Sequence, residues 1–567
     1  MAWTKQQQQA ISARSCSLIV SAAAGSGKTA VLVERLAGIL VDKENPVRAD
    51  RMIAATFTND AASELKQRLN EKLLYIISSE PENTYAIKQY TLLQNAKIST
   101  INSFCFELLR DNIGNQGIGA DFTVLDDTEN NIIKAECADE IKSKWCLERK
   151  NDMELLYDRF CIKDDSPITA LILEFDKFLS STAFRSKWLE DTKAEFDKPY
   201  NETVYFKTMM DDIIKELKKS IKLAENNIDM TDDIFDISSD EKIAKVAESS
   251  RAQSEDDYTR VSVALKTLLE NTEITEEIQA YCNGFGRLIS VSKKLEYDTK
   301  LREKLKANRD FIKNSVKNTF SRLNSIEEDI TINKELFGIL KDMVEEYFDL
   351  LWSRKTEKNA ISFDDGERLV LEMLADTDEN GNTIPSEIAR KISEYYDIIM
   401  IDEYQDSNDK QDMIFKLISK GCKVGNNGFV QYGKNAFLVG DVKQCIYKFR
   451  LANPENFINT LKSSEEYSAE NTKENSYLKL NKNFRSSESV INSVNFIFRE
   501  IMSESCGDVD YDSQEELNYG AEIFNGAVNK EKCTTQVTLI NTNNDDNADD
   551  IDDEQADETK LLPTDNP

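Results

Sequence analysis

The apolar and polar residues of the chain follow two different periods along its length. In residues 1–125, short apolar runs such as residues 18–20 are followed by segments with helical spacing, for example Val31, Leu32 and Leu36. Short buried runs linked by amphipathic helices are typical of a parallel sheet. We therefore predict an α/β domain at the start of the chain.

Residues 126–355 are highly charged, and their apolar residues recur every three or four positions. Two such stripes are Ile213, Leu217, Ile221 and Ala224, and Leu336, Ile339, Leu340, Met343, Val344 and Tyr347. This period predicts a helical insert whose stripes form its core. Residues 232–257 are acidic and relatively poor in large apolar side chains, which favours a loop within the insert.

Strand-like runs return in residues 356–480, at positions 398–401 and 436–439. The pattern predicts that the insert interrupts the α/β domain, which is completed after it. Another domain is expected to begin after residue 480. Residues 541–557 are nearly all Asp, Asn, Glu and Ala, which favours either a solvated acidic tail or a chain cut off within a domain.

The composition excludes several kinds of site. The 567 residues include no histidine, so histidine triads, histidine metal ligands and histidine general bases are excluded within the chain. The ten cysteines form no CxxC pair, and we expect reduced thiols in a cytosolic protein. A net charge of −32 argues against non-specific coating of nucleic acid but permits a narrow basic groove. Because no apolar run is long enough to cross a bilayer and no signal-peptide stretch is present, we expect no membrane association.

Residues 21–29, Ser-Ala-Ala-Ala-Gly-Ser-Gly-Lys-Thr, follow an apolar run and precede a helical segment. Glycines let backbone N–H groups surround phosphate oxygens, and the N-terminus of the following helix favours negative charge. In such a loop Lys28 contacts the β- and γ-phosphates, and the Thr29 hydroxyl binds Mg²⁺. The structural alternative is a glycine-rich turn between a strand and a helix. The other loop residues are Ala22 (where the strict pattern has glycine), Ala23, Ala24, Gly25, Ser26 and Gly27.

The apolar run at 398–401 leads directly into Asp402-Glu403-Tyr404-Gln405-Asp406. Carboxylates that end a buried parallel strand lie at the carboxyl edge of the sheet, beside the phosphate loop. Asp402 is placed there to hold hydrated Mg²⁺, and Glu403 to orient and deprotonate the attacking water. Phosphoryl transfer depends mainly on such positioning and on positive charge near the γ-phosphate.

Three further segments supply candidate contacts to phosphate and nucleic acid. After the strand at 436–439, a glutamine can sense the γ-phosphate, and aromatic and basic residues can stack on bases and pair with phosphates. A second Phe-Arg pair follows at 484–485, and Thr56-Phe57 follows a predicted strand at 52–55. The candidates in the first two segments are Gln444, Tyr447, Phe449 and Arg450, and Phe484 and Arg485.

Together these blocks resemble, in order and spacing, the superfamily-one DNA helicases of the UvrD/Rep/RecB type. The similar segments are residues 3–11 (the adenine-reading Q motif), 21–29 (motif I), 56–65 (motif Ia), 99–105 (the TxHSFC block), 402–406 (motif II), 440–452 (motif III) and 483–487 (motif IV). Asn102 replaces the histidine of the TxHSFC block, and Asp60 stands where motif Ia often has lysine.

The resemblance implies RecA-like motor domains that use ATP and Mg²⁺ and move 3′-to-5′ on DNA. It assigns hydrolysis to Glu403, Lys28, Gln444 and Arg485, the nucleotide to Gln7, residues 22–29, Phe484 and Arg485, and Mg²⁺ to Thr29 and Asp402. It assigns single-stranded DNA to Thr56, Phe57, Asn102, Tyr447, Phe449 and Arg450. Structural alternatives are that Phe57 and Phe449 are core aromatics, Asn102 a helix cap and Arg485 a surface ion-pair residue.

Within this family, the alanine-rich loop, residues 363–365 and residues 511–520 are similar to the AddA subunits of bacterial AddAB helicase–nucleases. This similarity implies double-strand break repair in the bacterial cytoplasm, at the nucleoid, on single- and double-stranded DNA, with an AddB-like subunit in a heterodimer. The implied domains are 1–125 and 356–480 (motor domain 1A), 126–355 (the 1B-like helical insert) and 481–567 (the start of domain 2A).

Motifs V and VI and a C-terminal nuclease are not recognisable in the sequence. Motif VI of the family supplies an arginine, and an arginine of this kind contributes on the order of a thousandfold to phosphoryl transfer. We therefore expect the chain alone to bind nucleotide, to hydrolyse it poorly, and neither to unwind nor to cut DNA. Two alternatives remain: part of a single-chain UvrD/Rep-type helicase, and a non-motor ATP-dependent module that binds DNA or a partner.

Overall fold

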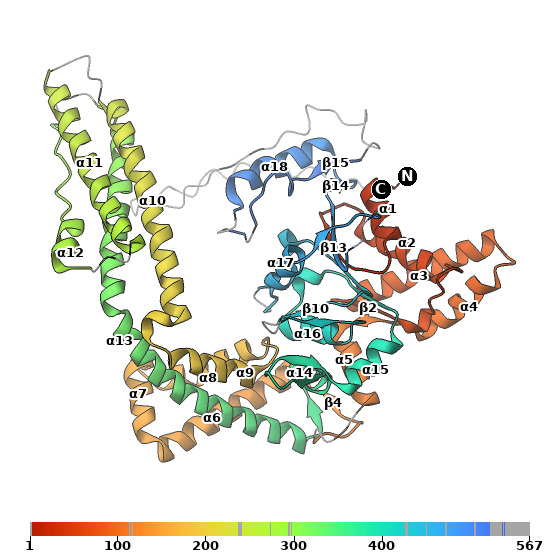
Figure 1. Cartoon of the computed structure of the whole chain (residues 1–567). Helices are drawn as coiled ribbons and strands as arrows, with labels where there is room; N and C mark the ends of the chain where they lie inside the picture. The colour runs from red at the N-terminus through yellow and green to blue at the C-terminus, as the bar shows by residue number, and fades with distance from the viewer. Residues whose placement is uncertain are drawn as a thin grey trace, which may run out of the picture.

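In the computed structural model of the chain, seven parallel strands form a central sheet in the order β12-β13-β1-β11-β8-β2-β3 (Figure 1). The structure describes residues 3–112, 114, 117–235, 241–270, 272, 274–292, 295, 297–425, 429–448, 451–470, 473–503, 506–507, 509–521, 536 and 538. The strands are β1 (Ser17–Ala22), β2 (Met52–Thr56), β3 (Lys97–Thr100), β8 (Ile398–Ile401), β11 (Ala436–Gly440), β12 (Glu465–Glu466) and β13 (Asn475–Leu480).

Both faces of this sheet are buried, because successive residues of a strand point to opposite sides. Ile19 and Ile399 belong to one apolar core, whereas Leu18 and Met400 belong to the other. The first core is covered by α5 (Ile101–Asp111), α14 (Phe363–Leu374), α15 (Glu387–Tyr395), α16 (Asp409–Leu417) and α17 (Pro454–Lys462). The second is covered by α1 (Lys5–Ser12), α2 (Lys28–Leu40) and α3 (Asn59–Ser79), and α4 (Thr84–Leu92) packs on α3.

The insert leaves and rejoins the α/β domain at one place, where β4 (Thr123–Val124) pairs in parallel with β5 (Ala360–Ile361). Its base packs around α13, a helix of 59 residues that spans Thr299–Glu357. The base helices are α6 (Asp127–Glu148), α7 (Lys150–Phe160), α8 (Ser166–Leu179) and α9 (Arg185–Phe196). The apolar residues at positions 336–347 lie in this core, as their spacing predicts.

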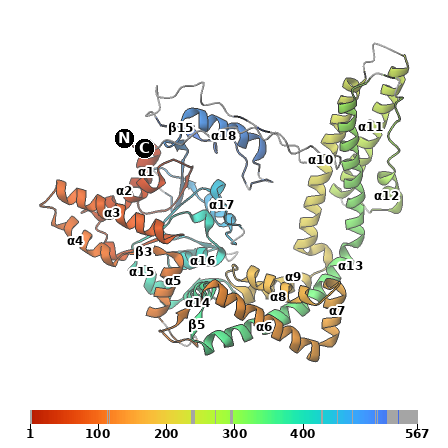
Figure 2. The same ribbon diagram turned by 180° about the vertical axis from the view of Figure 1, so that it is seen from behind.

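The first half of α13 continues away from the base and forms an arm with three other helices (Figures 1 and 2). These are α10 (Val204–Ile234), α11 (Glu241–Leu269) and α12 (Glu276–Asn283). The arm has its own core, in which Ile213 and Leu217 of α10 pack against Ile312 and Val316 of α13. Both views show the arm standing apart from the α/β domain.

The predicted loop over residues 232–257 is wrong for most of its length, since α10 extends to Ile234 and α11 begins at Glu241. Small side chains at Ala247 and Ser250 are buried, so few large apolar residues are needed for packing there. Asp257 is also buried, and its charge is compensated by the Arg309 guanidinium, with 3.1 Å between Nη2 and Oδ1.

The chain leaves the central sheet after β13, at the position where the sequence predicts another domain. β14 (Lys482–Asn483) pairs with β15 (Asn518–Tyr519) in a separate ladder, next to α18 (Glu488–Ile501). Two hairpins flank the sheet: β6 (Ala375–Thr377) with β7 (Thr383–Pro385), and β9 (Lys423–Val424) with β10 (Val430–Gln431). The predicted acidic tail at 541–557 lies outside the described residues. None of the described helices is long and apolar enough to span a bilayer.

Candidate nucleotide and nucleic-acid site

The loop between β1 and α2 has the backbone geometry of a phosphate-binding loop. Gly25 and Gly27 have positive φ angles of 70° and 81°, a region that side chains with a Cβ rarely adopt. Ala22 is the last residue of β1, outside the turn, and this explains why alanine is tolerated where the strict pattern has glycine. No side chain caps the N-terminus of α2, so its first N–H groups are available to an anion.

Lys28, the first residue of α2, contacts the carboxylate of Glu403. The Lys28 Nζ lies 3.0 Å from Oε1 and 2.8 Å from Oε2 of Glu403, although 375 residues separate the two in sequence. They meet because β1 and β8 are both parallel strands that end at the same edge of the sheet. The predicted phosphate-binding cation and the predicted base are therefore brought together.

Glu403 adopts a left-handed backbone conformation, with a φ of 51°. This conformation is unfavourable for a residue with a side chain, by about 1–2 kcal/mol. Non-glycine residues in such conformations cluster at functional sites. The neighbouring carboxyl, Asp402, accepts the backbone N–H of Glu403 at 3.0 Å. Burial, together with the negative charge of Glu403, raises the pKa of Asp402 to about 6.

Gln405 is a buried residue of the same motif to which the sequence analysis gave no role. Its Nε2 donates to Glu403 Oε2 and to Asp406 Oδ2, each at 3.1 Å. Its Oε1 accepts the backbone N–H of Asp441, at the end of β11, at 2.9 Å. Gln405 therefore fixes the Glu403 carboxylate and joins two strand ends. The only sequence signal for it is its place inside the DEYQD motif.

Gln444 follows β11 and lies next to this edge of the sheet. Its Nε2 donates to Asp441 Oδ2 at 2.8 Å. The other oxygen of Asp441 pairs with Lys443 at 2.9 Å. Asp441 thus orients both side chains, and the predicted γ-phosphate sensor is held by a carboxylate that the sequence analysis did not select.

Asn483 clamps the phosphate loop from the far end of the chain. Its Nδ2 donates to the Ala24 carbonyl at 2.8 Å, and the backbone N–H of Phe484 donates to the Gly25 carbonyl, also at 2.8 Å. A Cβ on Gly25 would come within 2.7 Å of the Asn483 side chain, so only glycine fits there. Arg485, the predicted γ-phosphate cation, is exposed beside the clamp.

Gln7, the predicted adenine-reading residue, lies against the other side of the loop. Its Nε2 donates to the Ser26 carbonyl at 2.9 Å, and its Oε1 accepts the backbone N–H of Thr4, also at 2.9 Å. Gln7, Ser26 and Phe484 line one small recess. The predicted nucleotide residues from three segments thus surround the loop. Ala23 joins the loop to β13, because its N–H donates to the Leu480 carbonyl at 2.9 Å.

The predicted DNA contacts are only partly brought together. Phe57 is half-buried and packs against the first apolar core, and Tyr447 is also half-buried. Thr56 is buried, and its hydroxyl donates to the Thr58 carbonyl at 3.0 Å, which places it inside the turn rather than on its surface. Phe449 and Arg450 lie outside the described residues.

Asn102 occupies the first turn of α5, but it is not the helix cap. That position belongs to Thr100, whose hydroxyl accepts the backbone N–H of Ser103 at 3.2 Å. The alternative reading of Asn102 as a cap is therefore wrong. Its Oδ1 is buried without a hydrogen-bond partner among the described residues, which leaves an acceptor to be satisfied.

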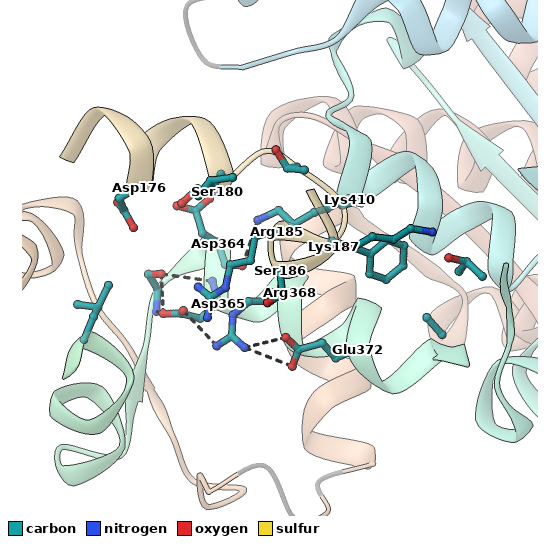
Figure 3. Close-up of a pocket in the computed structure, with 18 of the residues that line it drawn as sticks. Asp176, Ser180, Arg185, Ser186, Lys187, Asp364, Asp365, Arg368, Glu372 and Lys410 are labelled. Carbon is teal, nitrogen blue, oxygen red and sulfur yellow. Dashed lines mark hydrogen bonds and ion pairs between the residues drawn. The ribbon is translucent and has the colours of Figure 1, made fainter. Parts of the chain in front are cut away.

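A cavity of about 410 Å³ lies between the insert and the α/β domain, away from the phosphate loop (Figure 3). Its walls are charged, but most of the charges pair with one another. Lys134 pairs with Asp176 and Lys355 with Asp365, each at 2.6 Å. No residue of the phosphate loop or of the DEYQD motif lines it. We interpret this cavity as an ion-paired junction and not as the nucleotide site.

The residues at the sheet edge fit a magnesium–nucleotide complex. Carboxylate and hydroxyl oxygens are suitable ligands for Mg²⁺, which usually also keeps waters and phosphate oxygens. Thr29 and Asp402 provide such oxygens beside Lys28. The Ser26 hydroxyl is buried and has no partner within the described residues, as expected of a loop that closes around a ligand.

Comparisons with known proteins agree with this geometry. The family profile described as "UvrD/REP helicase N-terminal domain" matches residues 3–285 and 263–465. The A subunit of the ATP-dependent helicase/nuclease of Clostridium perfringens strain SM101 is 34% identical over 540 residues, which are 93% of this chain and 40% of that protein. The protein of the same name from Clostridium acetobutylicum is 34% identical over 552 residues, or 92% and 41% of the two chains.

The chain thus spans about 40% of the length of these relatives. The profile match includes the phosphate loop, the insert, the DEYQD motif and the segment after β11. The resemblance predicted from the motifs is confirmed, and the chain belongs to the UvrD/Rep helicase family.

Proposed function

We propose that the chain is the ATP-driven motor portion of an AddA-like helicase–nuclease subunit, which moves 3′-to-5′ on DNA in double-strand break repair and recombination. The contact between Lys28 and Glu403 carries this proposal, with 2.8 Å between Nζ and Oε2. Thr29 and Asp402 are their neighbours in sequence. A phosphate-binding cation, two metal ligands and a base therefore share one edge of the sheet.

Each of these residues has a defined part in hydrolysis. Bound Mg·ATP supplies the reacting phosphoryl group and the charge of the metal. Lys28 neutralises phosphate charge, and Thr29 and Asp402 would hold the metal. Phosphate oxygens compete with Glu403 for the Lys28 ammonium, which leaves the Glu403 carboxylate to accept a proton from water. Gln405 keeps that carboxylate in place through its hydrogen bond of 3.1 Å.

Movement on DNA requires that the nucleotide site and the DNA contacts change together. Gln444 and Tyr447 lie three residues apart on the segment after β11. A shift of Gln444 towards a γ-phosphate would therefore also shift Tyr447, which is placed to stack on a base. Phe57 follows β2, two strands away from β11 in the same sheet, and completes the proposed path for single-stranded DNA.

The partner is part of the same proposal. The relatives bear the name of one lettered component of a helicase/nuclease, which implies an assembly with a second component. We propose an AddB-like partner, in a heterodimer that works on single- and double-stranded DNA in the bacterial cytoplasm.

Binding and hydrolysis of ATP by the full chain, with and without oligothymidylate, test the proposal. Lys28→Ala should abolish binding of a fluorescent ATP analogue. Glu403→Gln should retain that binding but lower hydrolysis by about 100-fold or more, because the general base is lost. Glu394→Gln, a change at an exposed glutamate of α15, is the matched control and should behave like the wild type. Analogue binding that survives Lys28→Ala would contradict the proposed site.

A further inference from the structure

Two aromatic side chains of the insert line a groove that the sequence motifs do not include. Phe178 lies in the last turn of α8 and Trp188 in the first turn of α9, with 5.0 Å between their ring centroids. Phe178 is 45% exposed, and Trp188 is half-buried. The groove beside them has a volume of about 400 Å³, which is within the range of ligand sites in proteins.

The opposite wall of this groove belongs to the α/β domain, immediately after the segment that contains Tyr447. It consists of residues 451–455 and Asp409. Asp409 accepts hydrogen bonds from the side-chain amides of Asn453 and Asn456 at 2.7 and 3.0 Å, which fixes this wall. The groove therefore continues the proposed DNA path from motif III towards the insert, on the side where α8 and α9 face α16 and α17 (Figure 1).

The ring of Trp188 is held from behind. Phe337 of α13 contacts it edge-on, with 6.2 Å between centroids, and Trp188 packs against the core of the insert base. A ring fixed in this way loses little conformational freedom when another ring stacks on it. The exposed ring of Phe178 next to it extends the aromatic surface towards solvent.

Basic side chains surround the two rings, although the whole chain has a net charge of −32. Lys177 and Lys187 directly precede Phe178 and Trp188, and both lysines are exposed. Lys448 is exposed on the opposite wall, while Glu455 is the acidic residue nearest to it in sequence among those that line the groove. Aromatic rings between lysines suit a strand whose bases stack and whose phosphates face the cations.

We propose that Phe178 and Trp188 form a stacking site for bases of single-stranded DNA, which extends the path from motif III onto the helical insert. The inference rests on the proposed function, because it assumes that the strand crosses the α/β domain beside this groove. Single-stranded DNA is the occupant that fits, since only unpaired bases offer free faces to protruding rings.

Affinity for oligothymidylate, measured by fluorescence anisotropy with the full chain, tests the inference. Phe178→Ala and Trp188→Ala should each raise Kd on the order of tenfold. Trp188→Phe keeps a ring and should retain most of the affinity. Tyr75→Ala, at an exposed aromatic residue of α3, is the control and should leave Kd unchanged. Because Phe178 is exposed, its variant tests the site even if Trp188→Ala fails to fold.

Photo-crosslinking provides a second readout that a structural role would not give. Oligothymidylate that contains 5-iodouracil should crosslink to the peptide with residue 178 or 188. Normal wild-type binding with an unchanged Kd for Phe178→Ala and crosslinks only elsewhere would overturn this inference alone, and would point to a protein segment in the groove. Absence of wild-type binding to oligothymidylate would overturn the proposed function and this inference with it.

Discussion

Asp402 is a residue whose role in the proposed site costs stability. Its carboxyl is largely buried beside Glu403, and these two effects raise its pKa to about 6 from an ordinary value of 3.8. The folded chain therefore holds a proton that the unfolded chain releases between about pH 4 and pH 6. Stability falls as the pH rises through that window, and the penalty is complete above it.

Asp402→Asn should relieve this penalty, because the amide oxygen can still accept the N–H of Glu403. A shift of about two pKa units corresponds to about 1–3 kcal/mol, so the free energy of unfolding should rise by that amount at pH 7.5. The gain should disappear near pH 4. Urea unfolding followed by circular dichroism, without Mg²⁺, measures both values.

Asp349→Asn, at an exposed position of α13, is the control for this substitution and should change stability little at either pH. Equal or lower stability of Asp402→Asn at pH 7.5 would show that the carboxylate is not strained in the fold.

At the scale of elements, one buried ion pair joins the longest helix of the insert to the α/β domain. Lys355, near the end of α13, lies 2.6 Å from Asp365 in the first turn of α14, and both side chains are nearly inaccessible. Burial alone would raise the pKa of Asp365, but the charges of Lys355 and Arg368 and the hydrogen bonds from Lys355 and Ser362 lower it overall. The pair fixes the angle at which the insert leaves the sheet (Figure 3).

Lys355→Met should destabilise this junction by about 3–5 kcal/mol at neutral pH, since it leaves the Asp365 charge buried without its main partner. The stabilising effect of a carboxylate with a lowered pKa is present above its ordinary pKa and is lost as the pH falls. The difference from wild type should therefore shrink towards pH 3. Chemical unfolding at several pH values measures it.

The control is Lys391→Met, which removes an exposed pair with Glu387 on α15 and should cost less than about 0.5 kcal/mol. A similar small effect for Lys355→Met would mean that the apolar core of the junction, rather than its ion pair, holds the insert.

At the scale of the whole molecule, Glu515 connects the segment after α18 to the central sheet. Its Oε2 lies 2.6 Å from Lys443 and its Oε1 lies 2.7 Å from Lys479 of β13. Lys443 adjoins Gln444, so the connection reaches the proposed γ-phosphate sensor. Burial opposes ionisation of Glu515, but the two lysines lower its pKa overall.

Glu515→Gln should loosen residues 509–521 from the sheet. Hydrogen bonds between charged groups contribute about 1.5–3 kcal/mol, so amide exchange in this segment should become faster by roughly tenfold or more. Hydrogen–deuterium exchange with mass spectrometry measures the change. The neighbouring Glu516→Gln breaks a pair with Arg499 of α18 only, and should leave the exchange of β13 unaltered. Unchanged exchange over 509–521 in Glu515→Gln would contradict this connection.

The elements were predictable where a local pattern determines them. The continuous apolar run of β8 and the glycines after β1 predict a buried strand and a phosphate loop, because both signals lie within a few neighbouring residues. The helix over residues 241–257 was not predictable in this way. Its packing depends on small side chains and on Arg309 of α13, which lies 52 residues from Asp257.

The sequence by itself determined the strands, the loop and the order of the motifs, since these depend on local spacing and on the alternation of strand residues. Only the tertiary structure decided which side chains meet across large separations. Asn483 reaches the Ala24 carbonyl over 459 residues, and Gln405 links two strand ends. Phe178 and Trp188 line a groove with residues from the other part of the chain. Such contacts depend on how the insert and the sheet pack, and no local period carries that information.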